Sequence, residues 1–140
     1  LRLTIGSDYS FRNGLYAFVE YHYNGAGARY PRDYLQVLTR PGVSEGAVYL
    51  LGKHYLTPGF SYPVTPLLTF TTQALINLSD PSFFIAPVVE YNIAENVYLS
   101  GGAFISLGES PRIVVPPFPE FRSEFGGYPS IFYSSFRVYF

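Results

Sequence analysis

Hydrophobic residues recur at every second position through most of this 140-residue chain. The clearest case is the segment 131–140, where Phe132, Phe136 and Phe140 share one parity while Arg137 and Tyr139 occupy the other. A period of two places apolar side chains on one face of a β-strand and polar side chains on the other. The same alternation is found in segments 1–11, 14–24, 65–79 and 96–108 and, less regularly, in 46–62 and 82–92. The sequence therefore predicts an all-β chain of about seven strands, most of them longer than the ~5–6 residues of an average strand.

The connections between these segments predict an antiparallel, up-and-down order. Asn13-Gly14 is a strong hairpin signal between the first two strands. Residues 62–66 and 93–96 are also short turns, which consecutive antiparallel strands can use and parallel strands cannot. Pro87 falls inside the fifth predicted strand, where it must forgo one ladder hydrogen bond.

The remaining connections lie at the opposite ends of the strands, and two of them are long. They are residues 25–45 and 109–130, with the short connection 79–81 between them. Pro31 at the start and Pro41-Gly42 at the end predict a helical turn over 31–39 in the first long loop. Five prolines in the second long loop predict no regular structure there.

Composition excludes several classes of function. Nine Lys/Arg against ten Asp/Glu give a net charge of −1, without the basic stripe of a nucleic-acid-binding protein. The absence of Cys removes thiolate metal sites and disulfides, and His22 and His54 are too far apart for a local metal motif. No apolar run reaches the ~18 residues of a membrane-spanning helix. We therefore expect no metal site, no cofactor, no nucleic-acid partner and no helical membrane span.

The sequence also argues against catalysis. His22 and Glu20 share one predicted strand face, but a nucleophilic hydrolase needs a serine beside its histidine. No serine stands at i+2 from His22, and Ser10 would approach the hairpin only near its opposite end. We expect no enzyme activity and no catalytic residues. His54 has the outward parity near one rim of the predicted sheet, where an interfacial role is expected.

Alternation alone is compatible with a soluble sheet that buries one face, but three features favour a membrane. Six of the predicted strands reach the ~9–11 residues of a tilted transmembrane strand. The short turns and the long loops fall on opposite sides if Phe140 lies at the periplasmic end. Aromatic residues gather near the strand ends, as in membrane girdles. They are Tyr9, Phe11, Tyr62, Tyr91 and Phe140 at the inner edge and Tyr21, Tyr23 and Phe132 at the outer edge.

The last strand ends Phe136-Arg137-Val138-Tyr139-Phe140, with a terminal Phe and apolar residues at alternate positions before it. This pattern resembles the C-terminal signature of Gram-negative outer-membrane β-barrels, and residues 8–21 look like a hairpin of larger, porin-like barrels. The resemblance implies a location in the bacterial outer membrane and contact with the lipid bilayer. It also implies that Phe136, Val138, Tyr139 and Phe140 form a signal for the barrel-assembly machinery.

The expected fold class is thus an antiparallel up-and-down transmembrane β-barrel segment, with residues 1–140 forming a single β-barrel domain. Bacterial barrels normally have an even number of strands, and the first predicted strand would start outside the cell. We therefore expect this chain to be the C-terminal portion of a larger barrel. The alternative is that several copies contribute strands to one barrel, so a homo-oligomer or a larger membrane complex is left open.

The predicted inward face carries most of the charged and amide side chains of the strands. These residues are Arg2, Asp8, Glu20, His22, Lys53, Tyr55, Gln73, Asn77, Glu90, Tyr133 and Arg137. In a wide barrel they would line a pore, and in a narrow one they would form a paired polar plug. The favoured function is a porin-like wall for passive diffusion of small solutes. One alternative is a non-conducting structural barrel that sheathes or anchors partner proteins in the outer membrane. Another is a soluble β-barrel that binds an apolar ligand.

Overall fold

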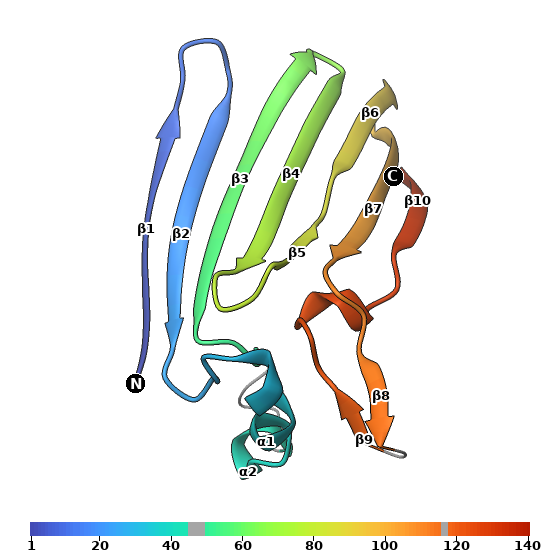
Figure 1. Ribbon diagram of the computed structural model, residues 1–140. Helices are drawn as coiled ribbons and strands as arrows, with labels where there is room; N and C mark the ends of the chain where they lie inside the picture. The colour runs from blue at the N-terminus through green and yellow to red at the C-terminus, as the bar shows by residue number, and fades with distance from the viewer. Residues whose placement is uncertain (45–49, 116–117) are drawn as a thin grey trace.

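A computed structural model describes residues 1–44, 50–115 and 118–140 of the chain, and an antiparallel eight-stranded sheet dominates it (Figure 1). The strands of this sheet are β1 (Arg2–Ser10), β2 (Tyr16–Asn24), β3 (His54–Thr65), β4 (Leu68–Asn77), β5 (Ser82–Ile85), β6 (Val88–Ala94), β7 (Val97–Leu107) and β10 (Ile131–Val138). Strands that follow one another in the sequence pair in the sheet, except that β5 and β6 both lie between β4 and β7 and do not pair with each other. The expected all-β, antiparallel, up-and-down order is confirmed.

Two of the predicted strands have different bounds in the structure. The fifth is divided into β5 and β6 at Ala86 and Pro87, because proline has no N–H to donate. Both halves nevertheless pair with β4 and β7. The third was expected over 46–62, but β3 begins at His54 and continues to Thr65, while 46–49 lie outside the described residues.

Residues 50–53 are not part of β3: Leu51 pairs with the loop that follows β2, and Lys53 pairs with Asn24, the last residue of β2. The N–H of Ala28 donates to the carbonyl of Leu51 at 2.8 Å, and the N–H of Asn24 donates to that of Lys53 at 2.8 Å. At its other end β3 continues to Thr65, within the turn expected at 62–66, and its pairing with β4 is irregular between Pro63 and Thr65. The Thr65 hydroxyl then closes the turn by accepting hydrogen bonds from the N–H groups of Leu67 and Leu68.

The two long loops are more regular than the sequence predicted. The helical turn over 31–39 is confirmed as η1 (Pro31–Asp33) and α1 (Tyr34–Leu38). Pro41 does not end the helical region, however, since it begins α2 (Pro41–Ser44). The second loop is not irregular: it contains the ribbon β8 (Arg112–Val115) with β9 (Phe118–Glu120), followed by η2 (Phe125–Gly127). Prolines are tolerated in a two-stranded ribbon because half of its N–H groups point away from the partner.

The cross-strand register keeps each parity on one side of the whole sheet. Residues directly opposite each other on neighbouring strands share a face. One such row contains Ile5, Tyr21, Leu56, Ile76 and Phe83, and the pairs Leu99–Tyr91 and Leu99–Phe136 belong to the same side. We call this side the apolar face and the opposite side the polar face.

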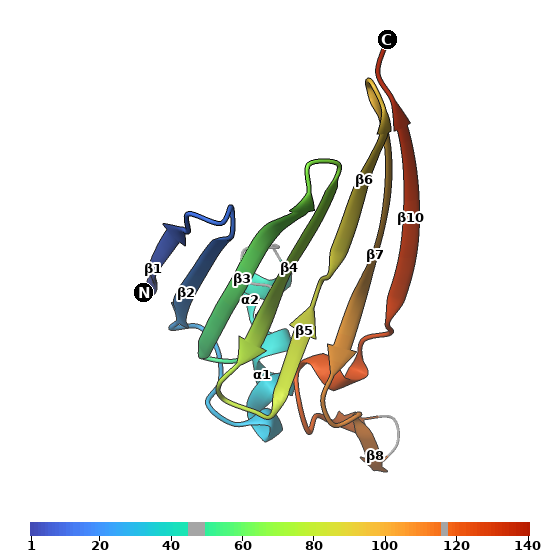
Figure 2. The same cartoon turned by 90° about the horizontal axis from the view of Figure 1, so that it is seen from above.

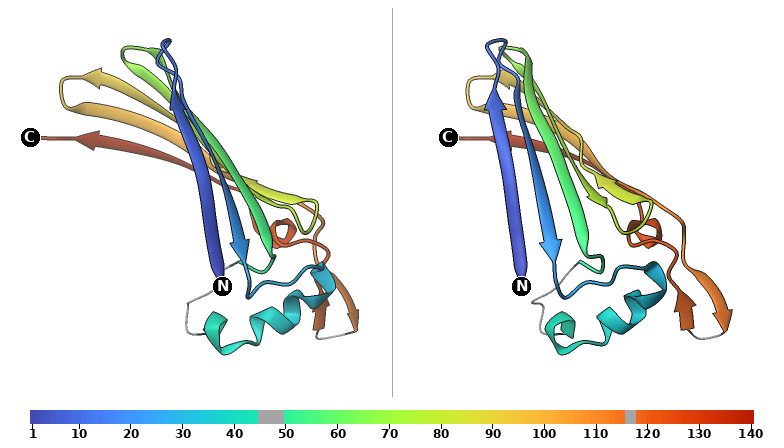
Figure 3. Two further views of the ribbon diagram at one scale, coloured as in Figure 1. Left: turned by 90° about the vertical axis from the view of Figure 1, so that its left-hand side faces the viewer. Right: turned by 60° about the vertical axis from the view of Figure 1, so that its left-hand side comes forward.

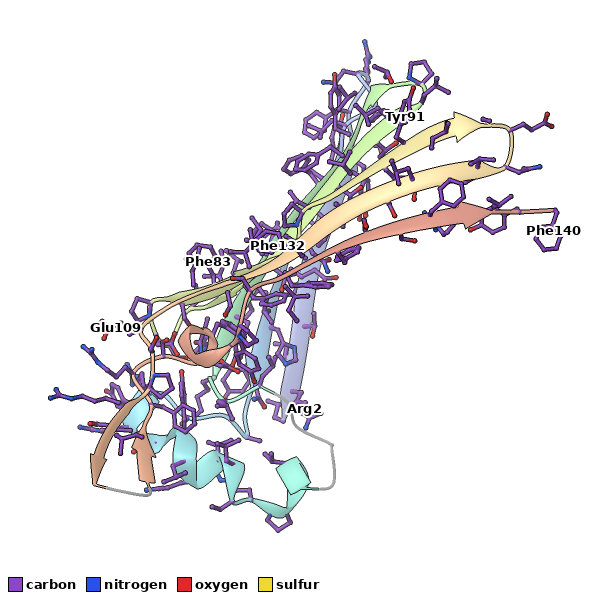
Figure 4. The ribbon with its side chains drawn as sticks, turned by 90° about the vertical axis from the view of Figure 1, so that its right-hand side faces the viewer. Arg2, Phe83, Tyr91, Glu109, Phe132 and Phe140 are labelled. Carbon is purple, nitrogen blue, oxygen red and sulfur yellow. The ribbon has the colours of Figure 1, made fainter. Side chains whose placement is uncertain are left out.

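The apolar face is exposed. Ile5 is 65%, Phe136 64% and Leu99 44% accessible. Among the described residues of this face, Ala103 alone is buried. Figure 4 shows side chains on both sides of the sheet, with Phe83, Tyr91 and Phe132 belonging to the apolar face and Arg2 to the polar one.

The two ends of the sheet differ. The short turns gather at one end, whereas α1, α2 and the β8–β9 ribbon all lie at the other (Figure 3). We call the second the loop end. The outer strands are β1 and β10, and neither has a second strand neighbour in the described part of the chain (Figure 2). Since every neighbouring pair on the path from β1 to β10 is antiparallel, these two edge strands run in the same direction.

The turn between β1 and β2 depends on Gly14, which has a φ of 85°. We expect Gly14→Ala to destabilise the fold by about 1–2 kcal/mol, because a side chain disfavours the left-handed conformation. Gly101→Ala in β7 is the matched control: an added Cβ would meet no heavy atom closer than 3.8 Å and the φ is ordinary. The shift in the denaturant midpoint of unfolding measures the effect of each variant. Equal shifts would show that the left-handed conformation of Gly14 does not determine the stability of the fold.

Candidate functional site

The polar face of the sheet carries the residues that the sequence assigned to a wet interior. All of them except Lys53 lie on strands and on this face. Lys53 lies just before β3, where its carbonyl accepts the N–H of Asn24, the last residue of β2. Their parity was therefore well predicted, and the question becomes which of them the fold brings together.

One cross-strand row of the polar face runs straight across five strands near the loop end. It consists of Thr4, His22, Tyr55, Asn77 and Ser82. Thr4 Oγ1 and His22 Nδ1 are 2.8 Å apart, so the hydroxyl nearest to this histidine belongs to Thr4 and not to Ser10. Tyr55 and Asn77 are fully buried, and Ser82 is buried beside them.

This burial comes from the two long loops, which fold over the row. In the first loop Ala28, Tyr34, Val37 and Leu51 form a small hydrophobic core, and Phe121 of the second loop packs against it. We call residues 25–40, 50–53 and 121–127 the loop cap. Farther from the loop end on the same face, Gln73 of β4 is exposed and Glu90 of β6 is half-buried. The polar face is thus covered at the loop end and open at the turn end.

Glu124 joins the cap to the sheet. Its Oε2 accepts the Tyr55 hydroxyl at 2.5 Å and Nδ2 of Asn77 at 2.7 Å. Its Oε1 accepts the N–H of Leu51 at 2.8 Å, and the N–H of Gly52 also points to Oε2, at 3.4 Å. A carboxylate that is only 3% exposed is therefore satisfied by donors from the first long loop, β3 and β4.

Asp80, in the turn between β4 and β5, is the second carboxylate of this network. Its Oδ2 accepts the Tyr34 hydroxyl at 2.6 Å, Nδ2 of Asn77 at 3.1 Å and the backbone N–H of Glu124 at 2.9 Å. The Ser82 hydroxyl donates to its other oxygen. Asn77 also donates to the Tyr34 hydroxyl at 2.9 Å, so one amide connects both carboxylates and the helix α1.

The electrostatics of the cap follow from burial. Loss of water raises the pKa of Glu124, although the hydrogen bonds from Tyr55, Leu51 and Gly52 favour its charged form; the nearby charge of Asp80 raises this pKa further. Burial, followed by the hydrogen bond to Asp80 and its charge, also raises the pKa of Tyr34. Tyr34 therefore remains protonated and can donate to Asp80.

An aromatic stack supports the cap from the other half of the sheet. Phe84, Phe104 and Tyr133 lie on the polar face of β5, β7 and β10, with ring centroids 5.8 and 5.5 Å apart. Phe125 of η2 is buried and lies 6.4 Å from Phe84. Rings at these distances attract one another, so the second long loop is held by apolar contacts as well as by Glu124.

Five of the remaining predicted residues form two separate groups farther from the loop end, while Arg2 lies at the loop end opposite Asn24. Asp8, Glu20 and Gln73 line a groove of about 570 Å³ over β1 to β4. Glu90 and Arg137 form an ion pair at a solvent-exposed position. Thus the structure connects His22, Tyr55 and Asn77 in one row and Glu90 with Arg137, but it does not unite the predicted residues in one site.

Outside the polar face, His54 lies on the apolar face near the loop end, as its parity predicted. Its Nδ1 is 2.6 Å from the Tyr21 hydroxyl, and its ring lies 5.4 Å from that of Tyr23.

Among the described residues no three His, Asp or Glu side chains gather closely enough to hold a metal ion. No helix in the described part of the chain is long and apolar enough to cross a membrane.

Sequence reasoning missed the centre of the network. Glu124, Asp80 and Tyr34 come from loops and a turn, where no periodicity indicates which way a side chain points. The available signal was indirect: Asn24 and Asn77 end their strands on the polar face, and an amide there needs partners from the loops.

Asn77→Ala tests how strongly the network stabilises the fold. It removes the amide shared by Glu124, Asp80 and Tyr34, and we expect a loss of about 2–3 kcal/mol because buried carboxylates then lack a donor. Asn92→Ala, on the same face in β6 and outside the network, should change stability by less than ~0.5 kcal/mol. Denaturant unfolding of both variants measures the difference, and similar losses would contradict this role.

Comparison of the chain with protein-family models, curated proteins and solved structures finds no match.

Proposed function

We propose that this chain forms part of the wall of an outer-membrane β-barrel and that the wall allows passive diffusion of small solutes. The apolar face would contact lipid, and the polar face would line a water-filled interior. The loop end would lie outside the cell and the short turns at the periplasmic side. The proposal also includes the terminal residues Phe136, Val138, Tyr139 and Phe140 as a signal read by the barrel-assembly machinery.

The exposure of the apolar face is the observation that carries this proposal. Exposed apolar side chains occur on β1, β2, β3, β5, β6, β7 and β10, including Leu3, Val19, Phe60, Val89 and Phe132, while the apolar side chains of β4 are half-buried between them. A soluble monomer rarely exposes such a contiguous surface. In a bilayer the same surface is stable because lipid tails surround it, and strands that alternate between lipid and lumen are typical of membrane barrels.

The position of the cap supports the same orientation. Both long loops pack on the polar face, so the polar face is the one that the chain itself encloses. A soluble barrel with an apolar ligand would require the opposite, with Phe136 and Leu99 covered. The rim pair Tyr21–His54 also fits a membrane boundary, where amphipathic rings are favoured.

The direction of the edge strands sets how such a wall can close. Unpaired backbone groups are costly in hydrocarbon, so both β1 and β10 would need strand neighbours. Because these strands run in the same direction, antiparallel closure takes an odd number of further strands between them. Identically oriented copies of the chain would instead bring β10 of one beside β1 of the next in parallel, which disfavours closure by copies alone.

A non-conducting structural barrel is the second candidate, and the loop cap is the observation that favours it. If the cap sealed the interior, the wall would serve to sheathe or anchor partner proteins. Liposome swelling with solutes of graded size separates the two candidates. Entry of small solutes supports a diffusion wall, while a solute-tight and correctly folded barrel leaves the structural role.

Two single-tryptophan variants test the orientation, since the chain contains no Trp of its own. Phe136→Trp places the probe on the apolar face and Tyr133→Trp places it on the polar face three residues away. In vesicles with brominated lipids we expect strong quenching of the first and weak quenching of the second. Aqueous iodide should give the reverse order. Equal quenching of both probes would contradict a lipid-facing apolar side.

Deletion of Phe140 tests the assembly signal. Phe140 is fully exposed, so its loss should change the unfolding free energy in detergent by less than ~0.5 kcal/mol. We nevertheless expect a large loss of assembled protein in the outer membrane of cells. Phe11→Ala removes an exposed aromatic residue at the same rim and serves as the control. An equal effect of the deletion on stability and on assembly would argue against a signal.

A further inference from the structure

Glu124 makes more hydrogen bonds to the sheet than a residue that only packs within its loop would make. Its carboxylate touches the first long loop, β3 and β4 at the same time, while its backbone N–H bonds to the turn after β4. No other described side chain of the second loop makes comparable contacts with the sheet; Ser123, beside it, bonds within its own loop to the carbonyl of Glu109. The attachment of the second loop to β3 and β4 therefore depends on one side chain.

The surroundings of this attachment are sealed. Asn24, Tyr55, Asn77 and Ser82 belong to four adjacent strands, and all four are buried under the cap. The same face is exposed at the turn end, at Thr71 and Gln73 of β4. The cap therefore controls access to the polar face from the loop side over β2 to β5.

The other contacts of the second loop are weaker. The ion pair between Arg122 and Glu109 is half exposed, and such surface pairs contribute little. Phe125 packs against Phe84 and Tyr128, but rings can slide without losing all contact. The directional part of the attachment to β3 and β4 resides in the hydrogen bonds of Glu124. The backbone of Phe125 adds two bonds to the neighbouring strands: the Ser106 hydroxyl of β7 donates to its carbonyl, and its N–H donates to the Ser82 hydroxyl of β5 at 3.3 Å.

We propose that Glu124 is a positioning residue that fastens the two long loops across the loop end of the polar face and thereby restricts the outer mouth of the lumen. The restriction of a lumen rests on the proposed function, whereas the fastening of the two loops by Glu124 does not. Solutes that reach the polar face from outside would pass between the cap and the edge strands β1 and β10. Releasing Glu124 would add the area over β2 to β5 to that passage.

The test compares Glu124→Gln with Glu120→Gln. Both variants remove one negative charge from the second loop, but Glu120 is exposed and lies outside the network. Glutamine keeps the shape of the side chain, so the substitution creates no cavity. Its NH₂ group would face a cluster of donors in place of a carboxylate oxygen, so the attachment of the loop should weaken. Tyr55→Phe, which removes one donor to Glu124, is the second variant in case the first does not fold.

The first readout is cleavage by trypsin after Arg122. This bond is protected because Ser123 and Glu124 are buried although Arg122 is exposed. If cleavage follows local opening, loss of the buried hydrogen bonds should accelerate it by about tenfold or more in Glu124→Gln and less in Tyr55→Phe. Glu120→Gln should be cleaved at the wild-type rate.

The second readout is the size limit for solute entry into liposomes, which should rise in Glu124→Gln and stay unchanged in Glu120→Gln. Trypsin rates that are equal in the two variants would overturn the fastening role. Faster cleavage with an unchanged size limit would overturn the restriction of the mouth. A wild-type protein that admits no solute would refute the proposed diffusion function, while the trypsin comparison would still decide whether Glu124 fastens the loops.

Discussion

The register between strands is the constraint on which the rest of the structure depends. Because opposite residues share a face, a single slip by one position would transfer every apolar side chain to the other side. The register is continuous from Thr4 through His22, Tyr55 and Asn77 to Ser82. It places hydroxyl, imidazole and amide groups in a straight line, and the two loops form hydrogen bonds with three members of this line, Tyr55, Asn77 and Ser82.

The buried polar network shows why the loops take one conformation. Withdrawing two carboxylates from water is costly unless each oxygen finds donors, and Glu124 and Asp80 find them in Tyr55, Tyr34, Asn77 and the backbone. Apolar packing alone would allow the loops many similar positions. Carboxylates with fixed donors allow few, so the network supplies specificity to a small core of Tyr34, Val37 and Leu51.

The sequence was informative where a period exists and much less so where it does not. Alternation located the strands and the parity of Glu20, Asn77, Glu90 and Arg137, because the strand geometry repeats every two residues. It failed at residues 50–53, whose apolar pattern resembles a strand although they pair with the last residue of β2 and the loop after it. It also failed for the second loop, where proline content hid a ribbon at 112–120 and nothing indicated the inward position of Glu124.

The place of Glu124 in the chain has a consequence for how the fold is completed. β10 is the last strand of the sheet, and the segment that joins it to β7 is also the segment that carries Glu124. Closing such a long connection costs chain entropy, and the contacts of Glu124 with β3 and β4 offset part of that cost from a distant part of the sheet. The pairing of β10 with β7 and the docking of the second loop on β3 and β4 therefore stabilise each other, because both shorten the free length of the same connection.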